Sequence, residues 1–128
     1  MYHLTALVTL LAIAFYFATC INVARSRDKT GVKAPAMSGH PDFERAFRIQ
    51  MNTLEWMPIV LPSLWLFAIY ISDPIAAAIG AVWIVGRIVY FIGYSKAAAK
   101  RSAGFAIQGI AAAALWAGAI GAVVLRMV

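Results

Sequence analysis

The chain has 128 residues, of which 63% are hydrophobic and only 12% are charged. A soluble domain of this size has too little interior for so many apolar residues, so the composition predicts an integral membrane protein. In a soluble protein the formal net charge of +6 would suggest a nucleic-acid partner. Here the basic residues fall between long apolar runs, so we expect them to set membrane topology and expect no nucleic-acid partner.

The first apolar run, Leu4–Ile21, carries no charge and predicts a membrane span over about residues 2–23. A cleavable signal peptide is the competing interpretation, but the run lacks a basic n-region and exceeds the usual apolar length of such peptides. The single cysteine, Cys20, excludes an intrachain disulfide, and we interpret it as a packing residue. Residues 25–39 are basic and contain glycine and proline, which predicts an irregular loop.

A second helix is predicted to begin near His40, because Pro41 and the acidic residues after it favour a helix start. We interpret His40 as a residue near the cap and not as a metal ligand. The apolar run that follows, Ile59–Ile71, is shorter than the roughly 20 residues that a span needs. The span must therefore begin near Ile49, which brings polar side chains to membrane depth, where they normally face a protein interior or a wet cavity.

One face of this second helix carries a polar stripe. Arg48, Asn52 and Glu55 are spaced i, i+4 and i+7, which places them together on a helix of about 3.6 residues per turn. Arg48 can hold a carboxylate through a forked hydrogen bond, and Glu55 can receive an ammonium group. A structural alternative is that Arg48 only forms a helix-supporting pair with Glu44.

Two further apolar runs, Ile75–Tyr94 and Phe105–Leu125, bring the number of predicted spans to four. The predicted fold class is therefore all-α, an integral membrane four-helix bundle. We expect the third helix to continue past the membrane surface to about Ala99, which would lift Arg101 to the interface.

The third helix and its extension carry a second polar set: Arg87, Tyr90, Tyr94 and Arg101. At about 100° per residue, these positions return to within about 60° of one face. In the structural alternatives, Arg87 pairs with Glu55 or caps an interior network, and the tyrosines are interfacial aromatic residues. The polar faces of the second and third helices share one end of the bundle, so we expect them to line one pocket.

Basic residues lie at 25–33 and 96–101, whereas the short turn at 72–74 has none. By the positive-inside rule both basic loops are expected to be cytoplasmic, with both termini on the opposite side. Arg126, at the end of the fourth span, is a minor exception.

A pocket with arginines, one carboxylate, an amide and two phenols suits a small zwitterionic anion. The sequence offers no Ser-His-Asp, Cys-His or paired-carboxylate arrangement for acyl or glycosyl transfer, and no ligand cluster for a metal. Catalysis would therefore need a nucleophile brought by the ligand. Arg101 could stabilise the thiolate of a soluble thiol that meets a lipophilic electrophile from the bilayer.

Two segments resemble a known family. Residues 43–55 read FERAFRIQMNTLE and resemble the F-E-R-x-x-R-x-Q-x-N-x-x-E signature of the MAPEG family, the membrane-associated proteins of eicosanoid and glutathione metabolism. Residues 90–101 read YFIGYSKAAAKR and resemble the Y-F-x-G-Y-x-x-A-x-x-R-type segment of the same family. The SAGF sequence at 102–105 is most similar to the branch of microsomal glutathione transferase type 2 and the leukotriene-forming synthase.

The resemblance implies a single four-span domain over residues 1–128 that assembles as a homotrimer, with glutathione as co-substrate bound between subunits near the cytoplasmic side. By matched position, glutathione would be held by Arg48, Asn52, Glu55, Tyr90 and Tyr94, with Arg101 stabilising its thiolate. A neighbouring subunit would contribute Arg25 and Gln50. Gln50 points about 160° away from Arg48 on the helical wheel, which agrees with this division. The chain departs from the leukotriene-forming synthase at Trp56, where that enzyme has tyrosine.

The expected activity is a glutathione transferase or peroxidase that acts on lipophilic electrophiles or lipid hydroperoxides in contact with membrane lipid. The short chain suggests a bacterial inner membrane. One alternative is a non-catalytic, lipid-binding scaffold of the same family. Another is a small four-span multidrug exporter, although such exporters place an essential acid in the first span and none is present there.

Overall fold

The computed structural model describes all 128 residues and is built from four long helices: α1 (His3–Thr30), α2 (Pro41–Tyr70), α3 (Asp73–Lys96) and α4 (Ser102–Met127). A short 3-10 helix, η1 (Ala98–Arg101), joins α3 to α4. The chain has no strand, and four helical segments are long and apolar enough to cross a membrane. The predicted all-α class and the four spans are therefore confirmed.

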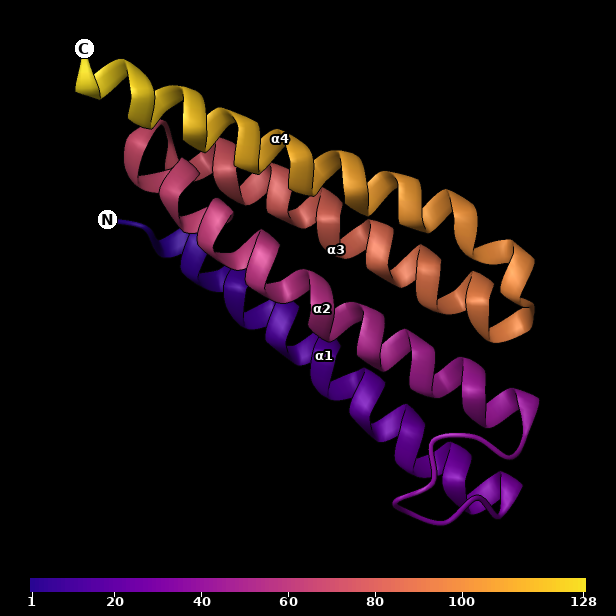
Figure 1. Ribbon diagram of the computed structural model, residues 1–128. Helices are drawn as coiled ribbons and strands as arrows, with labels where there is room; N and C mark the ends of the chain where they lie inside the picture. Colours follow the sequence, from indigo (N-terminus) through magenta and orange to yellow (C-terminus); the bar gives the residue numbers. More distant parts are fainter.

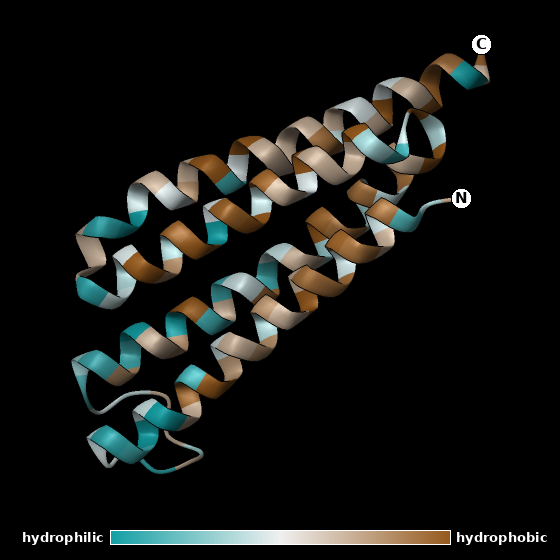
Figure 2. Cartoon of the chain, turned by 180° about the vertical axis from the view of Figure 1, so that it is seen from behind, coloured by the Kyte–Doolittle hydropathy of each residue, from teal (hydrophilic) through white to brown (hydrophobic).

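The helices run alongside one another and alternate in direction (Figure 1). Both termini and the α2–α3 turn lie at one end of the bundle, and the 31–40 loop and the α3–α4 connection lie at the other. The hydropathy colouring in Figure 2 shows that hydrophilic residues gather at this second end, whereas the middle of the bundle is mostly hydrophobic. We call the end with the 31–40 loop and η1 the loop end.

The end of α1 differs from the prediction. Residues 25–30 were expected to be irregular, but the helix continues to Thr30 and stops at Gly31, whose φ of 75° is in the left-handed region that glycine adopts easily. No glycine or proline interrupts residues 24–30. Arg27 and Lys29 lie in the last turn, where cations interact favourably with the helix dipole.

The start of α2 agrees with the prediction, because His40 is its N-cap. The Asp42 backbone N–H donates to His40 Nδ1 over 3.1 Å, and Pro41 opens the first turn. At the start of α3 the cap is Ser72, whose Oγ accepts from the Ile75 N–H. The carboxylate of Asp73 instead accepts hydrogen bonds from backbone N–H groups at the start of α1, and it therefore ties α1 to the α2–α3 turn.

The α3–α4 connection also differs from the prediction. Helix α3 ends at Lys96 and does not reach Ala99, because Ala97 has an extended backbone and η1 folds back on α3. A Cβ atom at Gly93 would overlap the carbonyl of Lys100, so the close turn requires a glycine there. Arg101 is thus brought back toward the α3 face by a tight turn and not carried outward on a longer helix.

Helices α3 and α4 pack closely at the same end. A Cβ atom at Gly104 would overlap the backbone of Tyr90, and one at Gly86 would lie 2.6 Å from the Gln108 nitrogen. Small residues allow this approach of helix backbones in membrane proteins. Arg87 and Tyr90 are therefore covered on the α4 side, and their polar ends face α2.

Candidate functional site

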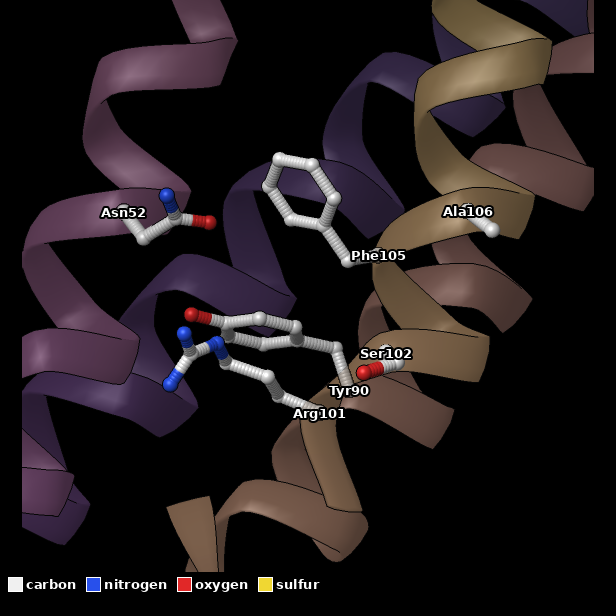
Figure 3. Close-up of a pocket in the computed structure, with 6 residues that line it drawn as sticks. All are labelled: Asn52, Tyr90, Arg101, Ser102, Phe105 and Ala106. Atoms are coloured by element: carbon white, nitrogen blue, oxygen red, sulfur yellow. The ribbon is translucent and has the colours of Figure 1, made fainter. Parts of the chain in front are cut away.

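A polar pocket lies at the loop end between α2, α3 and η1. One cavity of about 270 Å³ is lined by Arg48, Asn52, Glu55, Tyr90, Tyr94 and Arg101. A second cavity of about 440 Å³ is lined by Asn52, Tyr90, Arg101, Ser102, Phe105 and Ala106 (Figure 3). The two cavities share three lining residues, so we treat them as one site, the α2–α3–η1 pocket.

The structure brings together six of the eight site residues that the sequence singled out. In Figure 3, Asn52 points from α2 toward the side chains of Tyr90 and Arg101, which reach across from α3 and η1. The other two residues, Arg25 and Gln50, do not line this pocket. The polar faces of the second and third helices therefore converge within one chain, as expected. The pocket contains the six residues that the resemblance assigned to one subunit, and not the two that it assigned to a neighbouring subunit.

The α2 side of the pocket carries charges that have no ion partner within the chain. Arg48 and Glu55 are both exposed, and the only ion pair in the structure joins Arg45 to Asp42. The alternative pair between Glu44 and Arg48 does not form, because Glu44 accepts a hydrogen bond from the Gly39 N–H instead. Both pocket charges are free to bind a ligand.

The α3 side of the pocket is built from stacked aromatic rings. The Arg101 guanidinium lies 5.5 Å from the ring centre of Tyr94, and the Tyr94 and Tyr90 ring centres are 5.4 Å apart. Tyr90 is only 3% exposed, which contradicts the alternative that it is an interfacial belt residue. The rings and the guanidinium hold one another in place at favourable edge and cation–π distances.

Phe105 continues this aromatic series toward α2. Its ring centre lies 6.2 Å from that of Tyr90 and 5.8 Å from that of Trp56, the latter pair meeting edge to face. On the far side of Trp56, a groove of about 260 Å³ between α2 and α4 is lined mostly by apolar residues. Trp56 and Phe105 thus stand between the polar pocket and an apolar groove.

Arg87 lies behind the pocket and is fully buried. It donates from Nη1 to Asn52 Oδ1 over 2.8 Å and from Nη2 to Thr53 Oγ1 over 2.7 Å. Of its two structural alternatives, the interior network is confirmed and the ion pair with Glu55 is wrong. The guanidinium also stacks 4.3 Å from the ring centre of Tyr90.

Gln50 and Arg25 lie outside this pocket. Gln50 donates from Nε2 to the Sγ atom of Cys20 over 3.3 Å, so it faces α1, and Arg25 is exposed near the end of α1. This agrees with the helical wheel, which placed Gln50 almost opposite Arg48. A site that used all eight residues would need Arg25 and Gln50 of one chain to reach the α2–α3–η1 pocket of another.

The sequence analysis did not assign Ser102, Phe105 and Ala106 to the pocket, but the structure places them in it. They were missed because α4 begins at Ser102, directly after η1, and not near Phe105. No group of three or more His, Cys, Asp or Glu side chains could hold a metal ion. The pocket offers cations, one carboxylate, hydroxyl groups and an amide, which suit an anionic or zwitterionic ligand.

Four helices that are long and apolar enough to cross a membrane, with a pocket lined by two arginines at one end, define a small integral membrane protein. The chain belongs to the MAPEG family, whose model matches residues 5–121. The family recognised from the two sequence motifs is therefore confirmed.

Three relatives illustrate the similarity. An uncharacterized protein of Synechocystis is 51% identical over 90% of this chain and 84% of its own length. Microsomal glutathione S-transferase 2 of Homo sapiens is 44% identical over 83% of this chain and 71% of its own length. Leukotriene C4 synthase of Cavia porcellus is 37% identical over 78% of this chain and 67% of its own length. At the level of the family, these similarities support glutathione-related transferase activity.

Proposed function

We propose that the protein is a membrane-embedded glutathione transferase in which Arg101 stabilises the glutathione thiolate. The observation that carries the proposal is the convergence of Arg101 with Arg48, Asn52, Glu55, Tyr90 and Tyr94 around one pocket. Two relatives whose names describe a glutathione transferase and a leukotriene C4 synthase support glutathione as the co-substrate.

The chemistry of the pocket matches the groups of glutathione, which has two carboxylates, one ammonium group and a thiol. Arg48 presents a planar guanidinium for a carboxylate, and Glu55 presents a carboxylate for the ammonium group. The thiol would lie near Arg101, whose positive charge and N–H groups favour the thiolate over the thiol. Tyr90 and Tyr94 offer hydroxyl groups for the remaining polar atoms.

In the proposed reaction, the thiolate attacks an electrophilic carbon of a lipophilic molecule. A carbon–sulfur bond forms, and the electron pair of the broken bond leaves with the leaving group or stays on the oxygen of an opened epoxide. With a lipid hydroperoxide, the thiolate would attack the terminal oxygen and release an alkoxide. A second glutathione would then yield glutathione disulfide and water. No protein nucleophile is needed in either case.

The lipophilic substrate would reach the thiolate from the apolar side of the pocket. The groove beyond Trp56 is lined by Trp56, Ile59, Gly109, Ala112, Ala113 and Trp116. It adjoins the edge-to-face pair of Trp56 and Phe105, and Phe105 itself lines the pocket that contains Arg101. An aromatic or acyl group in this groove would therefore place its reactive carbon beside the thiolate.

We further propose that the functional unit is a homotrimer. Arg25 and Gln50 lie outside the pocket of their own chain, and a neighbouring subunit could bring both to it. Many large apolar side chains are exposed along the helices, and lipid or neighbouring subunits would cover them. We place the protein in the inner membrane of a bacterium, with the basic loop end in the cytoplasm and both termini on the opposite side.

A conjugation assay tests the proposal. Purified protein in detergent should conjugate glutathione with 1-chloro-2,4-dinitrobenzene, and Arg101→Ala should lower turnover at saturating glutathione. Lys100→Ala is the matched control, because it removes a neighbouring cation of η1 that does not line the pocket. Lipid binding without conjugation would instead indicate the non-catalytic scaffold, and proton-driven export from vesicles would indicate a transporter.

A further inference from the structure

Arg87 is a buried cation without an anionic partner. It is 0% exposed in the middle of a membrane-spanning helix, and no carboxylate lies within ion-pair distance of it. A buried charge normally needs a paired charge or several hydrogen bonds, because its loss of hydration costs several kcal/mol. Only two of its nitrogens are hydrogen-bonded within the chain, and Nε has no partner. Packing alone does not explain why an arginine occupies this position.

The contacts of Arg87 lead into the α2–α3–η1 pocket. Asn52, which accepts from Nη1, lines both cavities of the pocket, and so does Tyr90, on whose ring the guanidinium stacks. Thr53, which accepts from Nη2, is fully buried and lines neither cavity. Arg87 itself lines neither cavity. Arg87 is therefore connected to the pocket only through residues that line it, Asn52 and Tyr90.

The hydrogen bond to Asn52 fixes the orientation of the Asn52 amide. A guanidinium has only donors, so only the oxygen of the amide can face it. The NH₂ group of Asn52 is then not used by Arg87, and Asn52 lines both cavities of the pocket, so its N–H groups remain available to a ligand there. Arg87 thus occupies one lone pair of the amide oxygen, and both N–H donors of the amide stay free.

We propose that Arg87 is a positioning residue that makes Asn52 a hydrogen-bond donor to an anionic or carbonyl oxygen of the ligand. This inference rests on the proposed function for the identity of the ligand, glutathione. The positive charge of Arg87 strengthens the effect, because its bond to the amide oxygen polarises the amide and makes the NH₂ group a stronger donor. Arg87 and Asn52 thus form one unit, in which the buried cation never touches the ligand.

The first test is Asn52→Asp, with glutathione affinity measured by calorimetry and unfolding temperature measured without ligand. The new carboxylate should pair with Arg87, so the ligand-free protein should unfold at or above the wild-type temperature. Glutathione should bind about tenfold more weakly or worse, because a donor is lost and a negative charge faces the anionic ligand. Unchanged or tighter binding would overturn the proposal, because it would mean that Asn52 offers its oxygen to the ligand.

The second test separates positioning from a general structural role. Arg87→Met should weaken glutathione binding about tenfold in the wild-type background but less than about twofold in an Asn52→Ala background. Equal losses in both backgrounds would contradict the proposal, because Arg87 would then act independently of Asn52. Arg87→Lys keeps the charge and should restore part of the affinity that Arg87→Met loses.

Thr53→Val is the matched control. It removes the other hydrogen bond of the same guanidinium without touching the pocket, so it should lower the unfolding temperature and leave the affinity within about twofold of wild type. A loss as large as that of Arg87→Met would assign Arg87 to packing alone. If the wild-type protein binds no glutathione, the proposed function fails. The ligand-free comparison still tests the pairing, because the stability of Asn52→Asp should then fall when Arg87→Met is added.

Discussion

The two faces of α2 carry polar residues that meet different surroundings. On one face, Arg48, Asn52 and Glu55 open into a pocket that α3 and η1 complete. On the other, Gln50 turns toward α1 and meets the thiol of Cys20. A single helix therefore supplies one wall of the pocket and one polar residue, Gln50, that lies outside it. In a homotrimer, Gln50 of one subunit would help to complete the pocket of another.

The largest effect is expected at Arg101, whose guanidinium lies against the ring of Tyr94. Arg101→Ala should reduce turnover at saturating glutathione by about 10²-fold, because the developing thiolate loses its principal positive partner. Glutathione binding should fall far less. Rates measured with 1-chloro-2,4-dinitrobenzene over a range of glutathione concentrations separate the two effects. Equal turnover in wild type and variant would remove Arg101 from the mechanism.

A smaller effect, confined to glutathione binding, is expected for the two charged residues of α2 that line the pocket, Arg48 and Glu55. Arg48→Ala and Glu55→Gln should each weaken glutathione binding by about tenfold, since each removes one charged contact of the ligand. Turnover at saturating glutathione should stay within a few-fold of wild type. Calorimetry on detergent-solubilised protein measures the affinity, with Arg45→Ala as a control on the same helix, because Arg45 lies outside the pocket and pairs with Asp42. An unchanged affinity in both pocket variants would contradict the proposal that Arg48 and Glu55 contact glutathione.

Phe105, which lies between the polar pocket and the apolar groove, should affect binding of the lipophilic substrate and not binding of glutathione. Phe105→Ala should raise the KM for an aryl halide by about fivefold with little change in the KM for glutathione, because the ring borders the apolar groove and carries no polar contact. Trp116→Ala, farther along the groove, is the comparison variant and should affect long acyl substrates more than small aryl ones. Parallel changes in both KM values for Phe105→Ala would argue against a separate substrate groove.

Gln50, on the side of α2 that faces α1, gives the test of assembly. Gln50→Ala should weaken glutathione binding by about threefold, although Gln50 lies outside the pocket of its own chain. Cys20→Ala removes the partner of Gln50 within the chain and should leave the affinity unchanged. Matching losses in the two variants would mean that Gln50 acts only by packing against α1.

The smallest effect on activity is expected at the opposite end of the bundle. Asp73→Ala removes the acceptor for two backbone N–H groups at the start of α1, so the unfolding temperature should fall. Glutathione affinity should not change, because this end is remote from the loop end. A loss of affinity without a loss of stability would contradict the separation of the two ends.

The sequence predicted the helical fold and most of the pocket for clear physical reasons. Membrane spans require long apolar runs, and the i, i+4, i+7 spacing of Arg48, Asn52 and Glu55 fixes a shared face on any regular helix. Tyr90 and Tyr94, one turn apart, followed the same rule on α3. These features depend on local periodicity, which the sequence displays directly.

What the sequence could not give depends on turns and on contacts between helices. The prediction that α3 continues to Ala99 was wrong because the extended backbone of Ala97 and the close approach at Gly93 are properties of a turn. For the same reason Ser102 and Phe105 were not placed in the pocket. The choice of Asn52 and Thr53 as partners of Arg87, in place of Glu55, depends on how α2 and α3 rotate against each other, and residue spacing within one helix does not determine that rotation.

The most direct test of the central claim is an electron cryo-microscopy structure of the detergent-purified protein with glutathione. The predicted result is a trimer with glutathione in the α2–α3–η1 pocket, its sulfur beside Arg101, a carboxylate on Arg48, and Gln50 of an adjacent subunit within reach of the ligand. Glutathione bound elsewhere, or a pocket filled by lipid alone with Arg101 directed away from any sulfur, would contradict the account.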